Sequence, residues 1–565
     1  MVRLPEILAE SPLLVPQQVA FLEAAIARLT QHKDAWVQVA IPERINYLRQ
    51  CMKGVNEVAE AWAIAACKAK GIDPTSSLAG EEWTTGPLAT LLNMRLLIKA
   101  LEANGQPTPP SSSTRADGQV VAKIFPDNLP DRLLWLGFAG EVWIQPGEPA
   151  TQGLIYRQKS DCGKVVLILG AGNVSAIAAM DTLYKLFAED QVVLLKINPV
   201  NEYIGKFLEH AFQPLIADGF LEIVDGGAEV GQYLCQHPAI DTIHITGSHH
   251  THDAIVWGNP SAQQQQRKAS NRPLLTKPIT SELGCVTPIL VVPGKWSTSE
   301  LKFQARQIAS MVVHNASFNC VSAKVLVTAE GWHQRDEFLR LVQQELAKAT
   351  PRQAYYPGAQ QRYHSFLQHY PQAQVVGVDD TEVPWTIIPN VPPQPGEYAL
   401  TTEAFCGVLA EVTLPANDAA DFLTHAVEFA NEMVWGNLSC VLLVDRKTQK
   451  QYSTALEQAI AALQYGAIGV NVWTGVIFLL AACTWGAFPG NSLQDVRSGR
   501  GVVHNTYLFD HPQKTVLRAP FQIPITPIWF ADHKNLQQLA RCYIRFLMTP
   551  NWGNFLAIAI AALSG

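Results

Sequence analysis

The chain has 565 residues, of which 48% are hydrophobic and 16% are charged, and its formal net charge is -7. A chain of this length can bury more than one hydrophobic core, so we expect two or three domains. It contains no basic run and no interleaving of basic and aromatic residues, which argues against a nucleic-acid partner. Its 10 cysteines form no CxxC pair and no spacing suited to zinc, so most are expected to be reduced core thiols, without a metal site.

The N-terminal part is predicted to be helical and shows no secretory signal. Residues 1–14, MVRLPEILAESPLL, lack both a continuous apolar core and a small-residue cleavage site, so we predict a cytoplasmic protein. Helical periodicity dominates residues 1–135, and the Pro/Ser run at residues 107–114 marks a loop.

A strand followed by a helix occurs four times between Cys162 and Trp257. The strands are expected at the β-branched runs KVVLILG, QVVLLKI, LEIVDG and AIDTIHITG, and each run is followed by helical periodicity. Such repeats predict a doubly wound parallel sheet, whose ligands bind at the carboxyl ends of the strands. We assign residues 157–283 to this dinucleotide-binding domain and residues 1–135 to its helical N-terminal part.

After Trp257 the alternation of strands and helices resumes beyond a polar interruption. Residues 259–273 are Gln-rich and have no periodicity, which predicts an exposed loop or insertion. Residues 284–502 alternate again, so we expect a second α/β domain there.

The uncharged stretch of residues 458–494 could be mistaken for a membrane segment. Within it, residues 472–488 approach the length that spans a bilayer. Buried core is the favoured interpretation, because Gly466, Gly469 and Gly475 interrupt the stretch and GVNVW is typical of a short strand.

Three side chains in these segments suit the covalent oxidation of an aldehyde. Cys320 lies between a long helical stretch and a predicted strand, where a thiol can face a cleft. Its thiolate would add to the aldehyde and form an alkoxide, for which Asn173 and the backbone N–H of Cys320 are suitable donors. Hydride transfer to a nicotinamide would leave a thioester, and Glu282 in TSELG could activate the water that hydrolyses it.

Each of these residues has a simpler interpretation when it is taken alone. A single cysteine is most often a buried structural thiol, a single glutamate is a solvated surface charge, and a single asparagine is a turn residue. The catalytic hypothesis depends on the joint order along one run of strands and helices, which is Asn173, Lys196, Gly247-Ser248, Glu282, Cys320.

These motifs resemble those of the aldehyde dehydrogenase superfamily over a match from about Gly153 to Phe521. The family's Asn, strand Lys, FTGS-like turn, ELGG and NxGQxC segments correspond to Asn173, Lys196, Thr246-Gly247-Ser248, Glu282-Leu283-Gly284 and Asn315-Ala316-Ser317-Phe318-Asn319-Cys320. Its ExFGPV, asparagine-to-YGL and oligomerisation-strand segments are similar to Glu403-Ala404-Phe405-Cys406-Gly407-Val408, Asn431–Leu438 and Lys514–Pro520. The chain is identified as a divergent member of this superfamily.

The resemblance implies a cofactor, NAD or NADP, and a set of residues that bind it. Lys196 and Glu403 are expected at the ribose hydroxyls, Ser248 with Gly247 at the pyrophosphate, and Phe405 against the nicotinamide. It also implies a homodimer or homotetramer assembled through a small β element, for which we assign a hairpin at residues 136–156 and a strand at residues 503–522.

Several positions depart from the family's pattern. The Pro-Trp before the oxyanion asparagine is Ala171-Gly172, and the Gly-Gln before the nucleophile is Ser317-Phe318. The second glycine of ELGG is Cys285, and His252 replaces a glycine expected after the TGS turn. Pro199 stands where a glutamate usually favours NAD over NADP, so the choice of cofactor stays open.

Three functions are compatible with these residues. In the favoured one, Glu282 activates water and the product is a carboxylic acid. In the second, coenzyme A accepts the acyl group, as in acylating and acyl-CoA-reducing relatives, which GAGN without Pro-Trp resembles. In the third, the chain is an inactive scaffold of the same fold, against which the retention of Cys320, Asn173 and Glu282 argues.

The identity of the aldehyde and the role of the C-terminal tail each have two interpretations. The bulky residues Trp473, Phe478, Leu479, Leu480 and Trp485 suggest an apolar substrate, or they are simply core. The tail, residues 523–565, is expected to form an amphipathic helix with Asp532 as its N-cap and Leu536, Leu539, Tyr543, Ile544 and Leu547 on one face. It either docks on its own or a neighbouring subunit, or lies on a membrane surface or over an apolar substrate channel.

Overall fold

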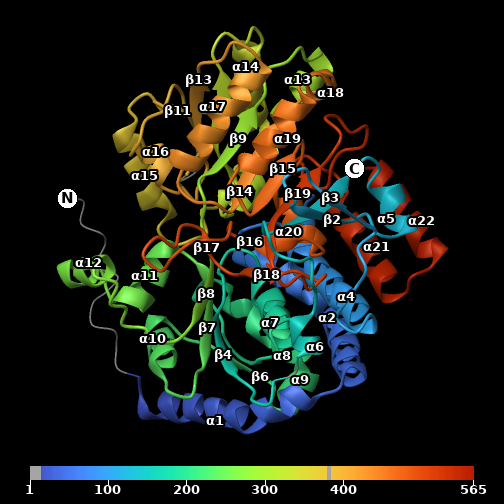
Figure 1. Ribbon diagram of the computed structural model, residues 1–565, viewed down its shortest axis with the longest axis vertical. Coiled ribbons are helices and arrows are strands. Elements are labelled where there is room, and N and C mark those ends of the chain that lie inside the picture. Colours follow the sequence, from blue (N-terminus) through green and yellow to red (C-terminus); the bar gives the residue numbers. More distant parts are fainter. Residues whose placement is uncertain (1–13, 159, 378–382) are drawn as a thin grey trace.

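The computed structural model describes residues 14–158, 160–377 and 383–565, and it contains two main sheets with flanking helices (Figure 1). Residues 1–13 lie outside the described residues, so the predicted lack of a secretory signal in residues 1–14 stays a prediction. Among the helices that the structure describes, none is both long enough and apolar enough to pass through a bilayer.

The first sheet is built from the predicted β-α units. Its strands run in the order β17-β8-β7-β4-β5-β6, and only β17 and β8 pair antiparallel. The strands are β4 (Val165–Leu169), β5 (Val192–Lys196), β6 (Leu221–Val224), β7 (Thr242–Gly247), β8 (Ile279–Leu283) and β17 (Gly499–Arg500). Between them lie α7 (Ile177–Phe187), η2 (Pro199–Ile204), α8 (Gly205–Ala211), α9 (Gln213–Ala217), α10 (Ala228–Gln236) and α11 (His249–Trp257). The predicted doubly wound parallel sheet is confirmed.

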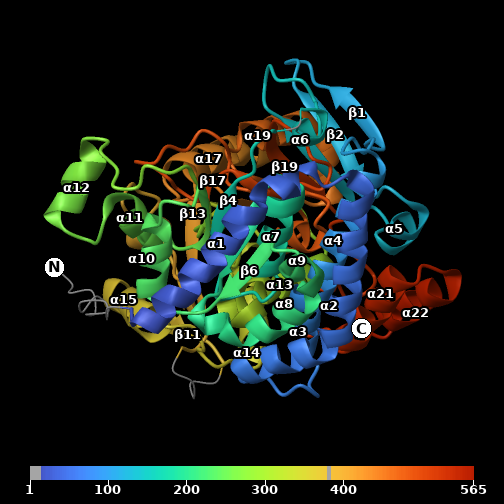
Figure 2. The same ribbon diagram turned by 90° about the horizontal axis from the view of Figure 1, so that it is seen from below.

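Helices from the N-terminal part complete the core of this sheet. They are α1 (Pro16–Gln38), α2 (Ile41–Ala69), α3 (Ala79–Trp83), the π-helical turn η1 (Thr84–Leu88) and α4 (Ala89–Glu102). Figure 2 shows α1 lying across the sheet, and α2 packs against α4. Every residue of β5 is buried, as expected for a parallel strand that is covered on both faces.

The second sheet has the strand order β1-β2-β3-β19-β15-β14-β9-β10-β13-β12-β11. Its strands are β1 (Ser111–Thr114), β2 (Val120–Phe125), β3 (Ala139–Ile144), β9 (Thr287–Val291), β10 (Ala323–Ala329), β11 (Gln374–Val375), β12 (Thr386–Ile388), β13 (Val408–Leu414), β14 (Ser439–Leu443), β15 (Ala467–Val470) and β19 (Pro512–Arg518). The helices α13 (Thr298–Val313), α14 (Arg335–Lys348), α15 (Ala359–His369), α17 (Ala419–Glu432) and α19 (Ser453–Ala462) belong to this half of the chain. The predicted second α/β unit is therefore present.

Two predicted loops contain regular structure. Within the Pro/Ser run, β1 pairs antiparallel with β2, and its four residues are exposed. The Gln-rich segment holds α12 (Ala262–Ala269), which Ser261 caps by accepting a hydrogen bond from the backbone N–H of Gln264 at 3.1 Å. No residue of α12 is buried. Both elements lack the apolar periodicity that signals structure in a sequence, because neither buries a face.

The uncharged stretch at residues 472–488 is core. It is divided between α20 (Gly475–Leu480) and β16 (Thr484–Gly486), which pairs with β18 (Val502–His504). Trp473 is 5% exposed and Trp485 is 1% exposed. The favoured interpretation of this stretch is confirmed.

The C-terminal tail forms two helices that pack on the chain itself. Helix α21 (Leu536–Met548) packs against α2, α3, η1 and α4, and α22 (Trp552–Leu563) packs against α21 (Figure 1). The predicted N-cap was wrong, because the Asp532 carboxylate pairs with Arg306 at 2.6 Å and Asn535 precedes the first turn. On the predicted apolar face, Leu536, Leu539, Ile544 and Leu547 are buried and Tyr543 is partly buried.

Candidate active site

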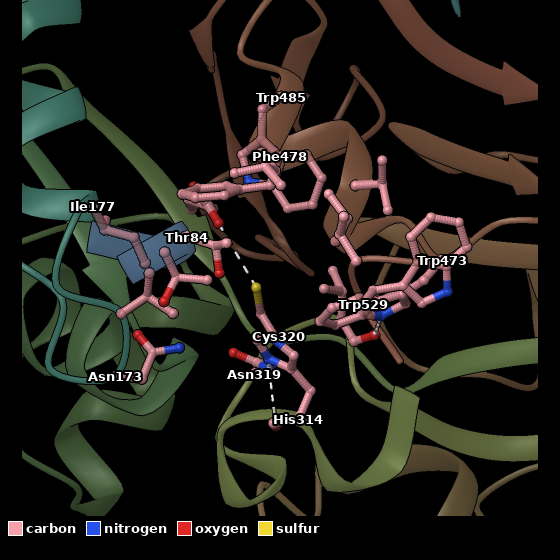
Figure 3. A pocket seen from close by; sticks show the side chains of 18 residues that line it. Thr84, Asn173, Ile177, His314, Asn319, Cys320, Trp473, Phe478, Trp485 and Trp529 are labelled. Carbon is pink, nitrogen blue, oxygen red and sulfur yellow. Dashed lines mark hydrogen bonds between the residues drawn. The ribbon is translucent and has the colours of Figure 1, made fainter. Parts of the chain in front are cut away.

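A pocket between the two sheets contains the three predicted catalytic side chains (Figure 3). Asn173 lies in the turn between β4 and α7, Glu282 lies in β8, and Cys320 follows the last turn of the α13 region. The remaining lining side chains are mostly apolar: Val174, Ile177, Val321, Trp473, Val476, Phe478, Leu479, Trp485, Ile528 and Trp529. Leu480, which was proposed with them, is buried and is not part of this lining.

The Cys320 thiol faces the carboxyl group of Glu282. Its Sγ donates to Oε1 of Glu282 at 3.8 Å, and the buried Oε2 has no hydrogen-bond partner among the described residues. Burial, together with the nearby charge of Asp181, raises the pKa of Glu282 to about 8. Desolvation and the Glu282 charge also raise the pKa of the Cys320 thiol well above its usual value. At neutral pH the pair therefore rests as a thiol beside a carboxylic acid.

Hydrogen bonds to both its side chain and its backbone hold Asn173 in the pocket. Its side-chain Nδ2 donates to the backbone carbonyl of Phe318 at 2.9 Å. Its backbone carbonyl accepts from Nδ2 of Asn315 at 3.0 Å and from the hydroxyl of Tyr355 at 3.1 Å. Because an amide nitrogen carries two N–H groups, one of them stays available to a ligand.

The turn before Cys320 has an unusual backbone. Asn315, Ala316 and Ser317 have φ values of 52°, 53° and 68°, which L-residues with a side chain adopt at a cost of about 1–2 kcal/mol each. Ser317 occupies the place where the family resemblance expects glycine. Such a conformation persists only when surrounding contacts impose it.

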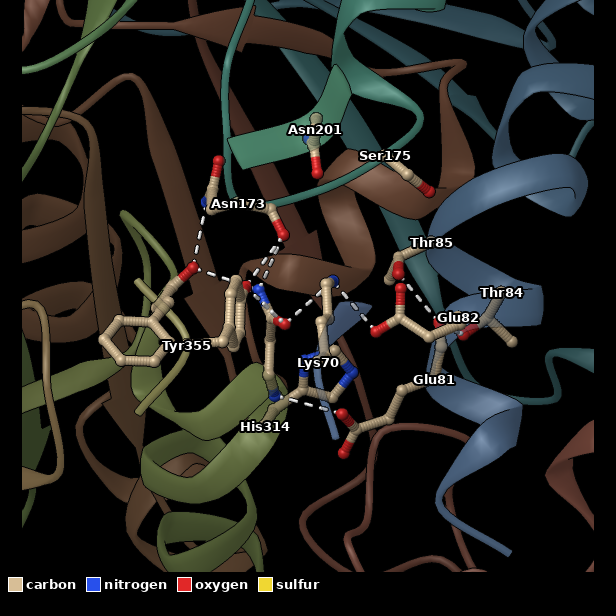
Figure 4. A network of polar contacts seen from close by, with 12 residues as sticks. Lys70, Glu81, Glu82, Thr84, Thr85, Asn173, Ser175, Asn201, His314 and Tyr355 are labelled. Atoms are coloured by element: carbon tan, nitrogen blue, oxygen red, sulfur yellow. Dashed lines mark hydrogen bonds and ion pairs between the residues drawn. The ribbon is translucent and has the colours of Figure 1, made fainter. Parts of the chain in front are cut away.

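A buried polar network, shown in Figure 4, supplies those contacts from α2 and α3. Lys70 Nζ donates to Oε1 of Glu82 at 2.9 Å and to Oδ1 of Asn315 at 3.0 Å. The backbone N–H of Asn315 donates to Oε2 of Glu81 at 3.1 Å. Burial opposes the charge of Glu81, but Arg352 pairs with both of its oxygens and the pKa of Glu81 falls to about 2.

This network could not be predicted from the sequence motifs, because Lys70, Glu81 and Glu82 lie far from Cys320 along the chain. One signal was present, since Glu81 and Glu82 are adjacent carboxylates directly before Trp83, in a segment with no other charged residue between Asp73 and Arg95. Two adjacent carboxylates in a buried helix require charged partners, and both have them here.

Three of the predicted cofactor residues lie at the carboxyl ends of strands in the first sheet. Lys196 ends β5 and is 7% exposed, and its side-chain amine makes no hydrogen bond or ion pair with another described residue. Gly247 ends β7, and the Ser248 hydroxyl caps α11 by accepting from the backbone N–H of Thr251 at 3.1 Å. An unpaired buried amine at the end of one strand and a helix N-terminus after another strand of the same sheet fit the hydroxyl and phosphate groups of a dinucleotide.

The other two cofactor residues come from the segment before β13. Glu403 Oε1 accepts from the backbone N–H of Cys285 at 3.3 Å and lies 3.5 Å from Nζ of Lys324. The Phe405 ring packs against Phe318, with ring centroids 5.7 Å apart. The Glu403 carboxylate is thus engaged by its own chain, and a ribose would share it with Cys285.

Comparisons with known proteins agree with this architecture. A model described as "Aldehyde dehydrogenase family" matches residues 144–360. No curated protein sequence matches the chain.

Solved structures match nearly the whole fold. A gamma-glutamyl-gamma-aminobutyraldehyde dehydrogenase from Burkholderia cenocepacia J2315 is 17% identical, with a TM-score of 0.62 over 89% of each chain. A Mycobacterium tuberculosis aldehyde dehydrogenase complexed with NAD+ is 18% identical, with a TM-score of 0.59 over 89% of this chain and 90% of the other. A NAD-dependent aldehyde dehydrogenase from Sinorhizobium meliloti is also 18% identical, with a TM-score of 0.58 over 89% of this chain and 88% of the other. The chain thus shares the fold of these aldehyde dehydrogenases, and its residues 144–360 match the aldehyde dehydrogenase family.

Proposed function

We propose that this protein is an NAD(P)-dependent aldehyde dehydrogenase that oxidises an apolar aldehyde to a carboxylic acid through a thioester on Cys320. The observation that carries the proposal is the 3.8 Å contact between the Cys320 thiol and Glu282 in a pocket with mostly apolar walls. A nucleophile beside a group able to take its proton is the arrangement that covalent catalysis needs.

The reaction begins when the Glu282 carboxylate takes the Cys320 proton and the thiolate adds to the aldehyde carbon. The new C–S bond pushes the carbonyl electrons onto oxygen, and the oxyanion accepts from the free N–H of Asn173. The backbone N–H of Cys320, which has no acceptor among the described residues, is the second donor. When it is bound, the nicotinamide cofactor accepts the hydride.

Hydrolysis of the thioester uses the same carboxylate again. Glu282 first releases the Cys320 proton to solvent and then takes a proton from water, and the hydroxide adds to the acyl carbon. The C–S bond breaks to release the acid, and Glu282 returns its proton to the thiolate. Lys196, Gly247 and Ser248 would hold the ribose and pyrophosphate, with Glu403 and Phe405 on the opposite side. The sum is aldehyde, water and NAD(P)+ giving acid, NAD(P)H and a proton.

Coenzyme A is the alternative acyl acceptor. Gly172, which replaces the family's tryptophan, is the residue that raises this alternative. A Cβ at Gly172 would lie 2.7 Å from Oδ1 of Asn198 and 3.1 Å from the hydroxyl of Tyr356, so the family's tryptophan would require these side chains to shift. GAGN without Pro-Trp resembles the acyl-CoA-reducing relatives. The contact of Glu282 with Cys320 favours water.

We also propose that the protein is a cytoplasmic homo-oligomer. Strands β1 to β3 and β19 extend one end of the second sheet, and β1 is an exposed edge strand. An edge strand presents unpaired backbone groups to another chain, which supports assembly through this element.

Peripheral membrane contact through α22 is a further part of the proposal. Trp552, Leu556, Ile560 and Leu563 are 61%, 57%, 68% and 73% exposed along one face of that helix, and α22 contains no charged residue. Helix α5 (Leu129–Leu134), which exposes Leu129 and Leu133, contributes Leu134 to the cluster formed by α21 and α22. An apolar helix face of this kind with a tryptophan at one end suits a lipid surface.

The function is tested by incubating the protein with a ladder of aldehydes, NAD or NADP, with and without coenzyme A. We expect reduced cofactor and free carboxylic acid without coenzyme A, and neither product from Cys320→Ala. Turnover that requires coenzyme A would assign the acylating reaction instead, and no turnover under any condition would support the inactive scaffold.

A further inference from the structure

The C-terminal tail supplies part of the catalytic pocket. Ile528 and Trp529 line it together with Trp473 and Phe478, and Figure 3 shows Trp529 and Trp473 on the same side of Cys320. Trp529 is 4% exposed, and its indole N–H has no hydrogen-bond partner among the described residues. An indole without a polar partner in this position acts as an apolar surface.

The tail is fixed to α13, the helix that leads to the nucleophile. The backbone N–H of Ala531 donates to Oγ of Ser310 at 3.0 Å. Arg306 pairs with Asp532 at 2.6 Å and lies 5.1 Å from the centroid of the Phe530 ring. Residues 530–532 are therefore anchored to one helix, which sets the position of the adjacent Trp529 relative to Cys320.

A second set of contacts joins the tail to the opposite side of the pocket. Helix α21 packs on α3 and η1, and η1 carries the pocket residues Thr84 and Thr85. A Cβ at Gly80 would lie 2.5 Å from Cβ of Leu536, so the close approach of α21 needs glycine at that position. The tail thus spans from α13 to η1 across the pocket.

Ile528 connects this pocket wall to the helices behind it. It lines the pocket and also packs against the cluster of Leu536, Leu539, Cys542, Ile558 and Ala561. Truncating the tail would therefore remove a wall and its support together.

We propose that Ile528 and Trp529 are specificity-determining residues, which form the wall that the apolar chain of the aldehyde packs against and which limit its length. The inference rests on the proposed function for its substrate. Glu282 faces the reacting thiol. The other ionisable side chain of the lining besides Cys320 is His314, and burial lowers the pKa of its imidazole and so keeps it uncharged. The part of the substrate remote from the aldehyde group is therefore an uncharged alkyl or aryl chain.

Two measurements on Trp529→Ala test the wall. In a series of straight-chain aldehydes, the ratio of kcat/KM for a long chain to that for a short one should rise about tenfold, since added room for even one methylene changes discrimination on this scale. Trp552→Ala is the matched control, because it removes the same side chain from an exposed position of the tail. It should leave the ratio unchanged.

The second measurement needs neither cofactor nor turnover. The rate of alkylation of the Cys320 peptide, followed by mass spectrometry, is compared for iodoacetamide and N-octyl iodoacetamide. Trp529→Ala should accelerate the long reagent relative to the short one, and Ile528→Ala, which removes less volume, should do so to a smaller degree. If the ratio of the two alkylation rates is unchanged in both variants, the proposal that Ile528 and Trp529 form this wall is overturned. A changed alkylation ratio in a protein that oxidises no aldehyde would keep the wall and refute the proposed function.

Discussion

Oε1 of Glu282 accepts a hydrogen bond from the Cys320 thiol at 3.8 Å, while the other carboxyl oxygen is buried without a partner among the described residues. The pair is in a resting state, because burial holds both groups in their protonated forms at neutral pH. Catalysis must begin with the loss of the Glu282 proton.

The reactivity of Cys320 should therefore depend on pH through Glu282. The pKa of Glu282 is raised to about 8, so the carboxylate that accepts the thiol proton is scarce below that pH and abundant above it. Alkylation of the Cys320 peptide by iodoacetamide should rise with pH across this range in the wild-type protein. In Glu282→Gln this rise should disappear, and an identical profile in both proteins would contradict the role of Glu282 as base.

NADP should be used at least as well as NAD. With Pro199 at the position of the usual glutamate, no carboxylate there repels a 2′-phosphate. Asp225 is the carboxylate that could take over the role of this glutamate. It directly follows Val224, which is the register partner of Lys196 in the sheet. Kinetics with both cofactors decide the point. A strong preference for NAD would be against this prediction, and its loss in Asp225→Ser would assign the discrimination to Asp225.

Lys70 should act as a positioning residue for the nucleophile turn. Lys70→Met leaves Glu82 buried without its cation and frees Asn315, so the free energy of unfolding should fall by about 3–5 kcal/mol. Because Asn315 also holds Asn173, kcat should fall more than KM rises.

The double variant Lys70→Met with Glu82→Leu separates stability from position. Replacing both members of a buried ion pair by apolar residues restores most of the stability, but the contact with Asn315 stays lost. Denaturant unfolding should recover while kcat stays low. Recovery of both quantities would show that Lys70 only stabilises the fold.

Leu556→Glu with Ile560→Glu tests the proposed lipid contact. Both side chains are exposed, so the folded monomer should tolerate the changes. Wild-type protein should sediment with vesicles of neutral and anionic lipid, and the variant should stay in solution. Loss of the oligomer in the variant, with no wild-type binding to vesicles, would instead assign this face to a second copy of the chain.

The sequence predicted those parts of the structure that are encoded locally. The β-α units were predictable because β-branched runs such as Val192–Lys196 and the helices after them carry different periodicities. The motif order also predicted that Asn173, Glu282 and Cys320 come together, since strand ends meet at one edge of a sheet.

Long-range contacts could not be predicted in the same way. Lys70 is 245 residues from Asn315 in sequence, and no spacing rule connects them. The approach of Trp529 to the pocket was equally hidden, since the segment before α21 has no helical or strand periodicity. Asp532 had the chemistry of an N-cap but was recruited by Arg306.

The most direct test of the central claim is a single-turnover experiment on Glu282→Gln with aldehyde and NAD(P)+. At alkaline pH, where bulk base can supply the thiolate, the account predicts one equivalent of reduced cofactor and then a stall, with the acyl group found by mass spectrometry on the Cys320 peptide. Steady turnover by Glu282→Gln, or an acyl group on another residue, would contradict it.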